Sequence, residues 1–368
     1  MISSRAAVLH RPGEPLRIET ITVAPPGPGE ALVEIAASGL CHTDTTAFDG
    51  GNPSCVYPAV LGHEGAGRVM EVGPEVTGLR AGDHVIPLYG PECGSCRMCL
   101  SGRTNLCWTI KDTRDRGVMP GGTSRFRLGD QTVHHFMGTS TFSQYTVLPE
   151  IALARIRSDA PLDSVCLLGC AATTGAGAAL EDVRNGDSVA VFGLGGVGVN
   201  VVQGARIAGA KRIIGVDTVA AKRPLAERLG MTDFVDASAV DDIVGAVHEL
   251  SGGGVDAAFE CTGIVPVMRQ AVDSLIAGWG TCVLLGVEPS GAQLSFPPVL
   301  ARYGRTIKGS YFGGVKGRSG LGRFVDLYLD GVLDIDSQIT HRAPLADINT
   351  GFDRMGRGEG IRTVISFD

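Results

Sequence analysis

The chain has 368 residues, which exceeds what one hydrophobic core usually supports and suits two domains. Hydrophobic residues make up 44% of it and charged residues 19%, so the chain can bury a large interior and does not have the composition of a disordered protein. The formal net charge of −7 argues against nucleic acid as a partner, because phosphate backbones require a basic face.

Neither a signal peptide nor a membrane span is expected. The stretch Met1–Leu9 lacks the charged-then-apolar pattern of a signal peptide. The longest uncharged runs, Ser164–Leu180 and Ser188–Ala205, are rich in Gly and in polar residues and make poor membrane spans. We therefore expect a soluble, cytoplasmic protein with no membrane partner, in which clustered cysteines bind metal rather than form disulfides.

The first third of the chain predicts a compact β-rich domain. Short runs rich in Val, Ile and Leu are separated by Pro/Gly turns, such as residues 24–29. The predicted strands are Ala6–His10, Leu16–Val23, Ala31–Ala37, Gly67–Val72 and Asp83–Leu88.

From about Pro161 onward, predicted strands alternate with predicted helices. The strands are Ser188–Phe192, Arg212–Val216, Asp233–Asp236, Ala257–Glu260 and Thr281–Val287. The helices are Val197–Ala208, Pro224–Leu229, Asp241–Leu250 and Val265–Ala277, and a later helix, Leu321–Leu329, precedes a last strand, Thr363–Phe367. This alternation predicts an α/β domain with a parallel sheet and helices on both faces.

Four cysteines are concentrated in one short stretch of the β-rich part. Cys93, Cys96 and Cys99 follow at three-residue intervals, and Cys107 comes after seven further residues. Four thiolates at such spacings complete a tetrahedral shell around Zn²⁺ and leave no position for water, as in a structural site. Buried free cysteines, a redox pair and an iron–sulfur cluster are the alternatives. The glycine in the loop and the seven-residue gap favour zinc.

Three further residues have the chemistry of a second, open zinc site. Cys41 and His63 each follow a strand-like segment, and Cys170 lies where the pattern of elements changes. Two thiols and one imidazole would leave a fourth position open, where zinc polarises a bound alcohol and lowers its pKa. Their separations of 22 and 107 residues form no local motif, so spacing alone does not decide this site.

A glycine-rich turn joins the predicted strand that ends at Phe192 to the next predicted helix. Its glycines are Gly193, Gly195, Gly196 and Gly198. In this context they match a dinucleotide fingerprint, in which the pyrophosphate binds at the helix N-terminus. Asp217 ends the next strand, where a carboxylate accepts the ribose 2′-hydroxyl and favours NAD over NADP, and Lys222 could reach the same ribose. The alternative is an ordinary glycine-rich turn that binds nothing.

In their order, these segments resemble the zinc-dependent medium-chain alcohol dehydrogenases over nearly the whole chain. The matching segments are Cys41–Asp44, Gly62–Gly67, the four-cysteine stretch, Leu168–Cys170 and Gly193–Gly198. Residues 121–126, 138–145 and 312–314 are most similar to the class III branch, glutathione-dependent formaldehyde dehydrogenase. The resemblance implies a GroES-like catalytic domain of residues 1–171 and 312–368, with a zinc lobe near 90–110, around a Rossmann NAD-binding domain of residues 172–311.

The same resemblance implies a role for individual residues. Cys41, His63 and Cys170 would hold a catalytic zinc, and the four clustered cysteines a structural zinc, giving two per chain. Glu64 matches a carboxylate that can join or neighbour these ligands, Asp44 an acid that orients the histidine ligand, and Thr43 the hydroxyl that takes the substrate proton. The residues that match cofactor contacts are His42 and Arg362 for the pyrophosphate, Thr174 and Val197 for the nicotinamide ring, and Val287, Ser310 and Phe312 for its carboxamide.

Four positions depart from the pattern of the family. Thr46 stands where many members have a histidine, which leaves the end of the proton relay open. Lys111 stands where the class III branch has an arginine that holds the glutathione carboxylate, so the charge is kept and the bidentate fork is lost. Asn52 and Ser54 replace acidic residues that bind the amino end of glutathione. A different thiol adduct or a plain primary alcohol is therefore an open choice of substrate.

We expect reversible hydride transfer between a primary alcohol, or a thiol hemiacetal such as S-hydroxymethylglutathione, and NAD. One alternative is an aryl or allylic alcohol dehydrogenase that needs no thiol cofactor. Another is a zinc protein that binds dinucleotide without turnover. The segment between Cys107 and His134 resembles that of dimeric members, so we expect a homodimer.

The remaining polar pairs and cysteines are expected to have structural roles. The cysteines outside the two clusters, expected as small packing residues, are Cys55, Cys166, Cys261 and Cys282. His134 and His135 would point to opposite faces of a strand, as surface or hydrogen-bonded residues rather than a metal pair. Asp241 and Asp242 would form the N-cap and first-turn charge of a helix.

Overall fold

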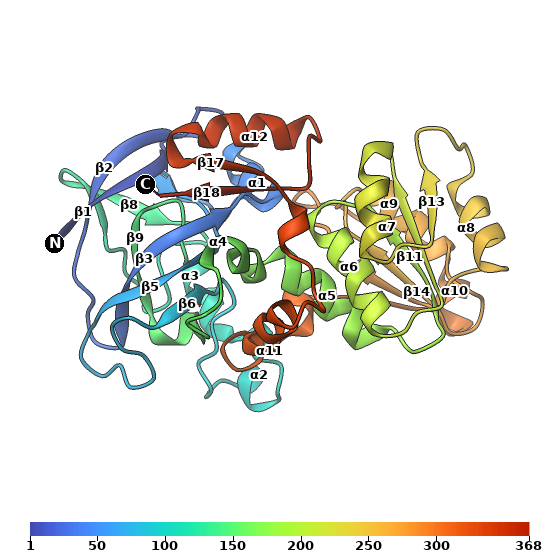
Figure 1. Ribbon diagram of the computed structural model, residues 1–368, viewed down its shortest axis with the longest axis horizontal. Coiled ribbons are helices and arrows are strands. Elements are labelled where there is room, and N and C mark those ends of the chain that lie inside the picture. The colour runs from blue at the N-terminus through green and yellow to red at the C-terminus, as the bar shows by residue number, and fades with distance from the viewer. Residues whose placement is uncertain (368) are drawn as a thin grey trace. The chain divides into compact units, whose positions relative to one another are not determined.

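The computed structural model describes residues 1–367, without the side chains of residues 112 and 114, and is drawn in Figure 1. The chain forms two compact units. The first unit contains Met1–Cys170 and the chain from Lys316 onward, and the second is Ala171–Val315. The units thus divide after residues 170 and 315, where the sequence analysis places the divisions after residues 171 and 311.

Part of the first unit is a closed barrel of short strands. In spatial order these strands are β1 (Ile2–Leu9), β2 (Arg17–Val23), β7 (Phe126–Leu128), β8 (Gln131–His135) and β4 (Ala59–Val60). β1 pairs with both β2 and β4, which closes the barrel. Its core side chains include Val8, Ile21 and Phe126, all fully buried.

The rest of the first unit's β-structure is a seven-stranded sheet. In spatial order its strands are β10 (Leu153–Ile156), β6 (His84–Pro87), β5 (Glu64–Val72), β3 (Glu30–Gly39), β18 (Arg362–Ser366) and β17 (Ile339–Pro344), while β9 (Tyr145–Pro149) pairs with β3. Gly39, at the end of β3, is paired with Glu64 on one side and Val364 on the other. This register brings the end of one strand beside the starts of two others.

The helices of the first unit are mostly short. They are α1 (His42–Phe48), α2 (Arg97–Leu100), α3 (Lys111–Arg114), α4 (Leu162–Val165), α11 (Gly317–Leu329) and α12 (Ile348–Gly356). A 3-10 turn, Cys166–Gly169, leads to Cys170 at the end of the unit's first segment.

The second unit contains a six-stranded parallel sheet. Its strands, in spatial order, are β13 (Asp233–Asp236), β12 (Arg212–Asp217), β11 (Ser188–Phe192), β14 (Ala257–Glu260), β15 (Thr281–Leu284) and β16 (Thr306–Gly309). Every residue of β11 and β14 is buried, as expected for strands covered on both faces. Numbered in chain order, the strands run 3-2-1-4-5-6, which is the order of a doubly wound Rossmann fold.

The first helix of this unit precedes β11, and the others connect consecutive strands. In chain order the helices are α5 (Ala171–Asp182), α6 (Gly196–Ile207), α7 (Arg223–Leu229), α8 (Ile243–Ser251), α9 (Val265–Asp273) and α10 (Pro298–Arg302). Asp242 is the N-cap of α8 and accepts a hydrogen bond from the Gly245 amide at 2.8 Å, which confirms that the Asp241 and Asp242 pair supplies the cap. The first-turn charge expected from the same pair is wrong, because the helix begins only at Ile243 and both acids precede it.

The α/β fold class and most predicted elements are confirmed, with shifts of a few residues. Two ends differ more: β15 ends at Leu284, so Val287 lies beyond the strand, and α9 ends at Asp273 rather than near Ala277. The helices and strands for which no range was predicted are α1, α2, α3, α4, α5, α10, α12, β4, β7, β9, β10, β16 and β17, and of β8 only His134 and His135 were expected on a strand.

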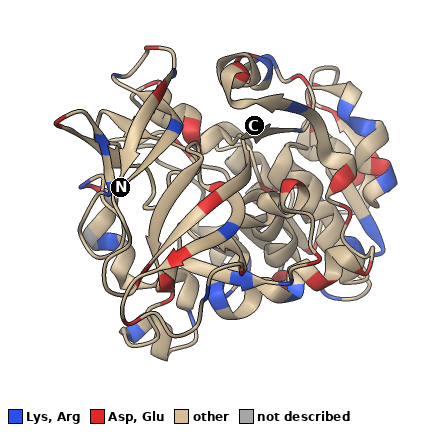
Figure 2. Ribbon diagram, turned by 60° about the vertical axis from the view of Figure 1, so that its left-hand side comes forward, with Lys and Arg blue, Asp and Glu red and all other residues tan. Residues whose placement is uncertain are grey.

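Figure 2 shows Lys and Arg interspersed with Asp and Glu along the ribbon. Among the described residues, no single helix has both the length and the apolar composition to cross a bilayer. Within the described part of the chain, the bent pair Leu162–Gly169 and Ala171–Asp182 meets that criterion when its two helices are taken together.

Candidate functional site

The register of the seven-stranded sheet brings three distant parts of the first unit together. Cys41 follows β3 directly, His63 immediately precedes β5, and Arg362 begins β18. Because β5 and β18 pair with the two sides of β3 at Gly39, these residues converge at one edge of the sheet. Residues that are more than 300 positions apart in sequence thus become neighbours.

A buried group of ligand atoms lies at this edge. It consists of the Cys41 and Cys170 sulfurs, a His63 ring nitrogen and a Glu64 carboxylate oxygen, all within 4.8 Å of one another. The predicted open set of two thiols and one imidazole is therefore assembled, and Glu64 lies with it. Cys170 reaches the group from the end of the 3-10 turn Cys166–Gly169.

Asp44 fixes the orientation of the histidine. Its Oδ1 lies 3.2 Å from His63 Nδ1 and accepts a hydrogen bond from the Gly62 amide at 3.1 Å. Its Oδ2 accepts from the Cys41 amide at 3.3 Å, at the N-terminus of α1. One fully buried carboxylate thus links the segments that carry two of the ligands. The orienting role predicted for Asp44 matches this geometry.

The donor set is suited to a metal ion. His63 Nε2 is buried and, within the described residues, has no hydrogen-bond partner, although a buried polar nitrogen without one is costly. Burial alone would lower the pKa of His63, but the charges of Asp44 and Cys41 raise it well above its ordinary value. Hydrogen bonding from Cys170 lowers the pKa of Cys41 well below its ordinary value. The Cys41 sulfur is therefore predisposed to be a thiolate, the form that binds zinc, whereas the same hydrogen bond and burial raise the pKa of Cys170 well above its ordinary value.

A buried ion pair adjoins this group. Arg362 Nη2 donates to Glu64 Oε2, and both side chains are almost completely buried. Burial raises the pKa of Glu64 to about 7, although the Arg362 charge opposes this shift. Gly39 makes room for the pair, since a β-carbon there would lie 2.5 Å from Glu64 Oε2 and 2.6 Å from Leu167 Cδ2. Arg362, matched by resemblance to a pyrophosphate contact, thus engages a carboxylate of the ligand group.

Tyr89 was missed by the sequence analysis. Its hydroxyl lies 3.7 Å from Cys170 Sγ, and its ring meets the His63 ring edge-on, with centroids 5.7 Å apart. The Phe136 ring also meets the His63 ring edge-on, with centroids 6.3 Å apart. A tyrosine just beyond a predicted strand gives no motif, so only the fold reveals these contacts.

The predicted relay and substrate residues lie on α1 and the loops nearby. Thr43 is half-buried on the first turn of α1, and His42 before it is exposed. Thr46 Oγ1 donates to the Thr43 carbonyl at 2.8 Å, so Thr46 is tied to the backbone of the same helix. The side-chain amide nitrogen of Asn52 lies 3.5 Å from Thr46 Oγ1 and donates to it.

Asn52 and Ser54, two positions at which the chain departs from the class III pattern, form hydrogen bonds within the protein. Asn52 Oδ1 accepts a hydrogen bond from the Ser54 amide at 3.0 Å, and Ser54 Oγ donates to Asp115 at 2.6 Å. Lys111 is exposed, with its ammonium 5.5 Å from the centre of the Trp108 ring. These side chains therefore already have neighbours of their own.

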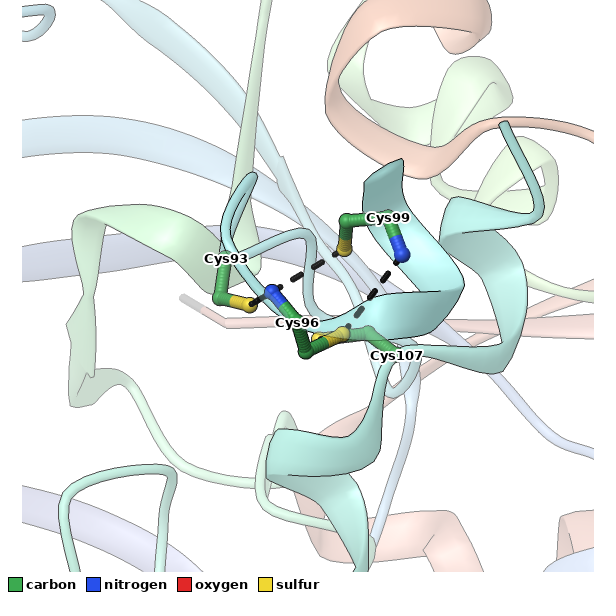
Figure 3. A group of neighbouring side chains, drawn as sticks. All are labelled: Cys93, Cys96, Cys99 and Cys107. Atoms are coloured by element: carbon green, nitrogen blue, oxygen red, sulfur yellow. Dashed lines mark hydrogen bonds between the residues drawn. The ribbon is translucent and has the colours of Figure 1, made fainter. Parts of the chain in front are cut away.

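The four clustered cysteines converge as predicted. Figure 3 shows their side chains directed toward one another from the loop before α2, from α2 and from the turn at Cys107. The Cys93–Cys99 and Cys96–Cys107 sulfurs are both 3.9 Å apart. Four sulfurs about 2.3 Å from one zinc ion would be about 3.8 Å apart, whereas a disulfide brings two sulfurs to about 2.05 Å. The spacing therefore fits one tetrahedral zinc.

Backbone amides prepare these sulfurs for a cation. The Cys96 amide donates to Cys93 Sγ at 3.4 Å, and the Cys99 amide donates to Cys96 Sγ at 3.5 Å. Partial burial would raise the pKa of Cys93, but hydrogen bonds from Ser95 and Cys96 lower it to about 5. The loop thus favours a thiolate at Cys93 before any metal enters, whereas burial raises the pKa of Cys99 to about 12.

The second unit contains the predicted glycine-rich turn. Gly193 follows β11 with a positive φ of 90°, and Gly195 is the N-cap of α6. A β-carbon at Gly195 would meet no heavy atom within 4 Å, so the backbone there is open to a ligand. A β-carbon at Gly198 would instead collide with the Gly193 carbonyl, which explains the glycine required one turn later. Gly196 and Val197 form the first turn of α6.

The predicted acidic residue lies beside this turn. Asp217 ends β12, and its carboxylate accepts hydrogen bonds from the Leu194 amide at 2.6 Å and the Val219 amide at 2.8 Å. Lys222 Nζ lies 2.9 Å from the same carboxylate. Asp217 and Lys222 are therefore brought together at the carboxyl end of the sheet.

The residues predicted to contact nicotinamide belong to several elements of the second unit. Thr174 lies on α5, and its buried hydroxyl has no hydrogen-bond partner within the described residues. Phe312 precedes Gly313, where a β-carbon would lie 2.6 Å from the Thr174 carbonyl, so these two segments touch. The Ser310 hydroxyl is also buried without a partner among the residues described, and Val287 is 58% exposed.

His135 corrects one prediction. It was expected to be at the surface or hydrogen-bonded, but it is buried, and both of its ring nitrogens lack a partner in the described part of the chain. Its ring stacks on Phe126 with centroids 4.5 Å apart. The alternation of faces was correct, since His134 is only half-buried, but the buried face of the barrel provides no polar group for His135. Of the four remaining cysteines, Cys55, Cys166 and Cys282 are buried and Cys261 is partly buried.

Comparisons with known proteins match both units. The alcohol dehydrogenase GroES-like domain matches residues 27–158, and the zinc-binding dehydrogenase domain matches residues 196–327. The chain is 49% identical to an S-(hydroxymethyl)glutathione dehydrogenase of Paracoccus denitrificans, covering 99% of this chain and 100% of that protein. It is 50% identical to an alcohol dehydrogenase class-3 of Cereibacter sphaeroides, with the same coverage.

Solved structures agree with these relatives. An alcohol dehydrogenase zinc-binding domain protein from Burkholderia ambifaria superposes with a TM-score of 0.94 at 36% identity, covering 100% of this chain and 99% of that one. Benzyl alcohol dehydrogenase from Acinetobacter calcoaceticus superposes with a TM-score of 0.93 at 31% identity, with both chains fully covered. Identity of this extent over the full length confirms the resemblance inferred from the motifs. The chain belongs to the zinc-dependent medium-chain alcohol dehydrogenase family.

Proposed function

We propose that the protein is an NAD-linked dehydrogenase that reversibly oxidises a primary alcohol, or a thiol hemiacetal, at the Cys41, His63 and Cys170 site. The observation that carries this proposal is the buried ligand group, in which His63 Nε2 has no hydrogen-bond partner among the described residues. A bound zinc would supply Lewis acidity, and a bound NAD would accept the hydride. An S-(hydroxymethyl)glutathione dehydrogenase at 49% identity and an alcohol dehydrogenase class-3 at 50% identity support this reaction class.

The chain's own residues would orient the reactants and move the proton. Cys41, His63 and Cys170 hold the metal, and Asp44 keeps His63 in the tautomer that leaves Nε2 free to bind it. Thr43, half-buried on α1 two residues after Cys41, receives the alcohol proton. Orientation of this kind can be worth about 7–11 kcal/mol of the barrier.

Metal analysis combined with an activity assay tests the proposal. We expect two zinc ions per chain and NADH formation at 340 nm with a primary alcohol. Zinc and NADH binding without any alcohol-dependent absorbance change would instead identify a binding protein without turnover.

We propose NAD rather than NADP as the cofactor because Asp217 offers a carboxylate at the end of β12. A carboxylate accepts the ribose 2′-hydroxyl and repels a 2′-phosphate. The Asp217→Ala variant should therefore narrow the preference for NAD over NADP, measured as the ratio of kcat/KM values. An unchanged ratio would assign the selectivity to other residues.

A second candidate substrate class is an aryl or allylic alcohol used without a thiol. The neutral side chains of Asn52 and Ser54 favour it, because they replace acids that the class III branch uses for glutathione and are already hydrogen-bonded. The benzyl alcohol dehydrogenase structure at 31% identity also favours it. Rates with benzyl-type alcohols should be compared with rates for formaldehyde plus glutathione or other small thiols.

The double variant Asn52→Asp/Ser54→Glu sharpens this comparison. If the acids are what glutathione requires, the variant should lower KM for the glutathione adduct and leave KM for benzyl alcohol nearly unchanged. Lys111→Arg is the matched test for the carboxylate of glutathione. It keeps the positive charge and adds a guanidinium that can form two parallel hydrogen bonds to a carboxylate.

We also propose a cytoplasmic homodimer. β16 is an edge strand of the six-stranded sheet, and Trp279 and Tyr303 beside it are 63% and 66% exposed. An open strand edge flanked by exposed aromatic residues suits association with a second copy. Light scattering should give twice the chain mass, and Tyr303→Asp should lower it.

A further inference from the structure

We propose that Glu260 is a positioning residue for dinucleotide binding, whose buried carboxylate fixes the turn after β14 against the glycine-rich turn after β11. This inference rests on the proposed dinucleotide function. No motif in the sequence marks Glu260, which was predicted only as the last residue of a strand.

Glu260 lies at the carboxyl end of the sheet, next to the glycine-rich turn. β11 lies between β12 on one side and β14 on the other, and Phe192 is paired with Glu260 at their carboxyl ends. The strand order reverses between β11 and β14, and ligands of open α/β sheets bind at such a switch point. The turns that follow Phe192 and Glu260 therefore form the two sides of the expected dinucleotide crevice.

The Glu260 carboxylate holds one of these turns. Its Oε1 accepts hydrogen bonds from the Thr262 amide at 2.7 Å and the Gly263 amide at 3.1 Å, and the Thr262 hydroxyl also donates to it. The side chain is fully buried, and no ion pair to it is found in the described residues. Because a buried carboxylate without a cation depends on such donors, the turn and the carboxylate stabilise each other.

The turn after β14 also packs against the loops that follow β11 and β15. A β-carbon at Gly193 would lie 2.6 Å from Thr262 Cγ2, so the Thr262 methyl packs directly on the glycine-rich turn. Gly263 has a positive φ of 79° and lies against the Val287 backbone. The Glu260 carbonyl accepts from the Leu285 amide at 2.8 Å. One residue thus links the loops that follow β11, β14 and β15.

Thr262 provides matched variants that test the link. Thr262→Val keeps a methyl against Gly193 and removes the donor to Glu260, whereas Thr262→Ser keeps the donor and removes the methyl. Glu260→Gln keeps the shape of the side chain but turns a donor toward the amides of the turn. Glu249→Gln, an exposed residue of α8, is the control.

The measurements are the Kd of NADH by fluorescence titration and the kcat and KM values for NAD and alcohol. We expect Glu260→Gln to raise the Kd of NADH and the KM of NAD about tenfold, since hydrogen bonds to a charged group are lost. Thr262→Val, which loses a hydrogen bond, and Thr262→Ser, which loses an apolar contact, should each give about a threefold rise. The kcat at saturating NAD and the KM of the alcohol should stay within about twofold of the wild type, and the control should bind NADH like the wild type.

The possible failures are distinguishable. A wild-type protein that binds no NADH would overturn the dinucleotide function itself. Wild-type binding that Glu260→Gln leaves unchanged would overturn the positioning role, as would a fall in kcat without a change in the KM of NAD. Should Glu260→Gln fail to fold, Thr262→Val decides, because it removes a single donor and equal NADH binding by it would overturn the role.

Discussion

The two cysteine-containing clusters of the first unit are built in opposite ways. Cys93, Cys96, Cys99 and Cys107 come from fifteen consecutive residues, and two of them are only partly buried. The Cys41, His63, Glu64 and Cys170 group spans 130 residues, and all four members are buried. A local loop can enclose an ion with its own sulfurs, whereas the second group depends on the register of a whole sheet.

This difference supports the proposed division between a stabilising site and a reactive one. The local cluster offers four sulfurs to a metal and leaves no position for another ligand. The distant group combines two sulfurs and a nitrogen with an acid that is already paired to Arg362. Stability should therefore respond mainly to the first cluster and turnover to the second.

The largest expected effect concerns the ligands of the distant group. His63→Ala and Cys41→Ala should each lower alcohol oxidation roughly a thousandfold, because Lewis-acid stabilisation is worth several kcal/mol. Zinc content should fall from two to one per chain, while NADH binding stays near that of the wild type. Cys282→Ala, which alters a buried cysteine of the second unit, is the control. Activity at a tenth of wild type or more would refute the metal role.

The next effect should appear in stability rather than turnover. Cys96→Ser removes one ligand of the local cluster, and loss of its zinc should lower Tm by roughly 10 °C. Cys55→Ser serves as the control, because Cys55 lies outside both clusters. Differential scanning calorimetry with zinc analysis checks the result, and full loss of activity at an unchanged Tm would reverse the assignment of the two clusters.

A smaller effect is expected from the acid behind His63. Asp44→Asn keeps the size of the side chain but weakens its hold on His63 Nδ1, so zinc affinity or kcat should fall about 10- to 100-fold. Asp49→Asn, an exposed change at the other end of α1, is the matched control. Similar kinetics for the two variants would show that the Asp44 contact contributes nothing.

The smallest effect contrasts two buried histidines. His63 has Asp44 beside it, whereas His135 has no partner among the described residues, and burial followed by the His134 charge lowers the pKa of His135 to about 3. The unfolded chain would take up this proton below about pH 6.5, so the free energy of unfolding should fall as pH drops from there toward 3.

At pH 5 this proton uptake should cost about 2 kcal/mol. His135→Leu should remove that part of the pH dependence, measured by urea unfolding at pH 7 and pH 5. His341→Gln, which changes a half-buried histidine, is the control. A pH dependence that persists in full in His135→Leu would assign it to other groups.

Much of the fold was predictable because its strongest signals are local. The strands of the second unit, such as Ser188–Phe192, are short apolar runs bounded by turn residues, and their positions were predicted closely. β17 was missed because its side chains are all partly or fully exposed and it ends in a proline. β7 has only three residues, too few for an alternating pattern.

The site residues likewise divide into those with a local sequence signal and those without one. The spacing of the four cysteines predicted their convergence, but that of Cys41, His63 and Cys170 followed only from resemblance to a family. The Glu64–Arg362 pair and the isolation of His135 could not be predicted, because each depends on which strands become neighbours. A pairing across 298 positions of the chain has no local signature.

Gly39 shows how narrow such a junction is. Any larger residue there would push into Glu64, Leu167 or Arg362. An alanine at this position would delete no ligand and no charge, yet the side chains of Glu64 and Leu167 would have to shift to admit its β-carbon. A substitution at this position would therefore act on the ligand group indirectly, through the side chains of Glu64, Leu167 and Arg362, although it removes no ligand.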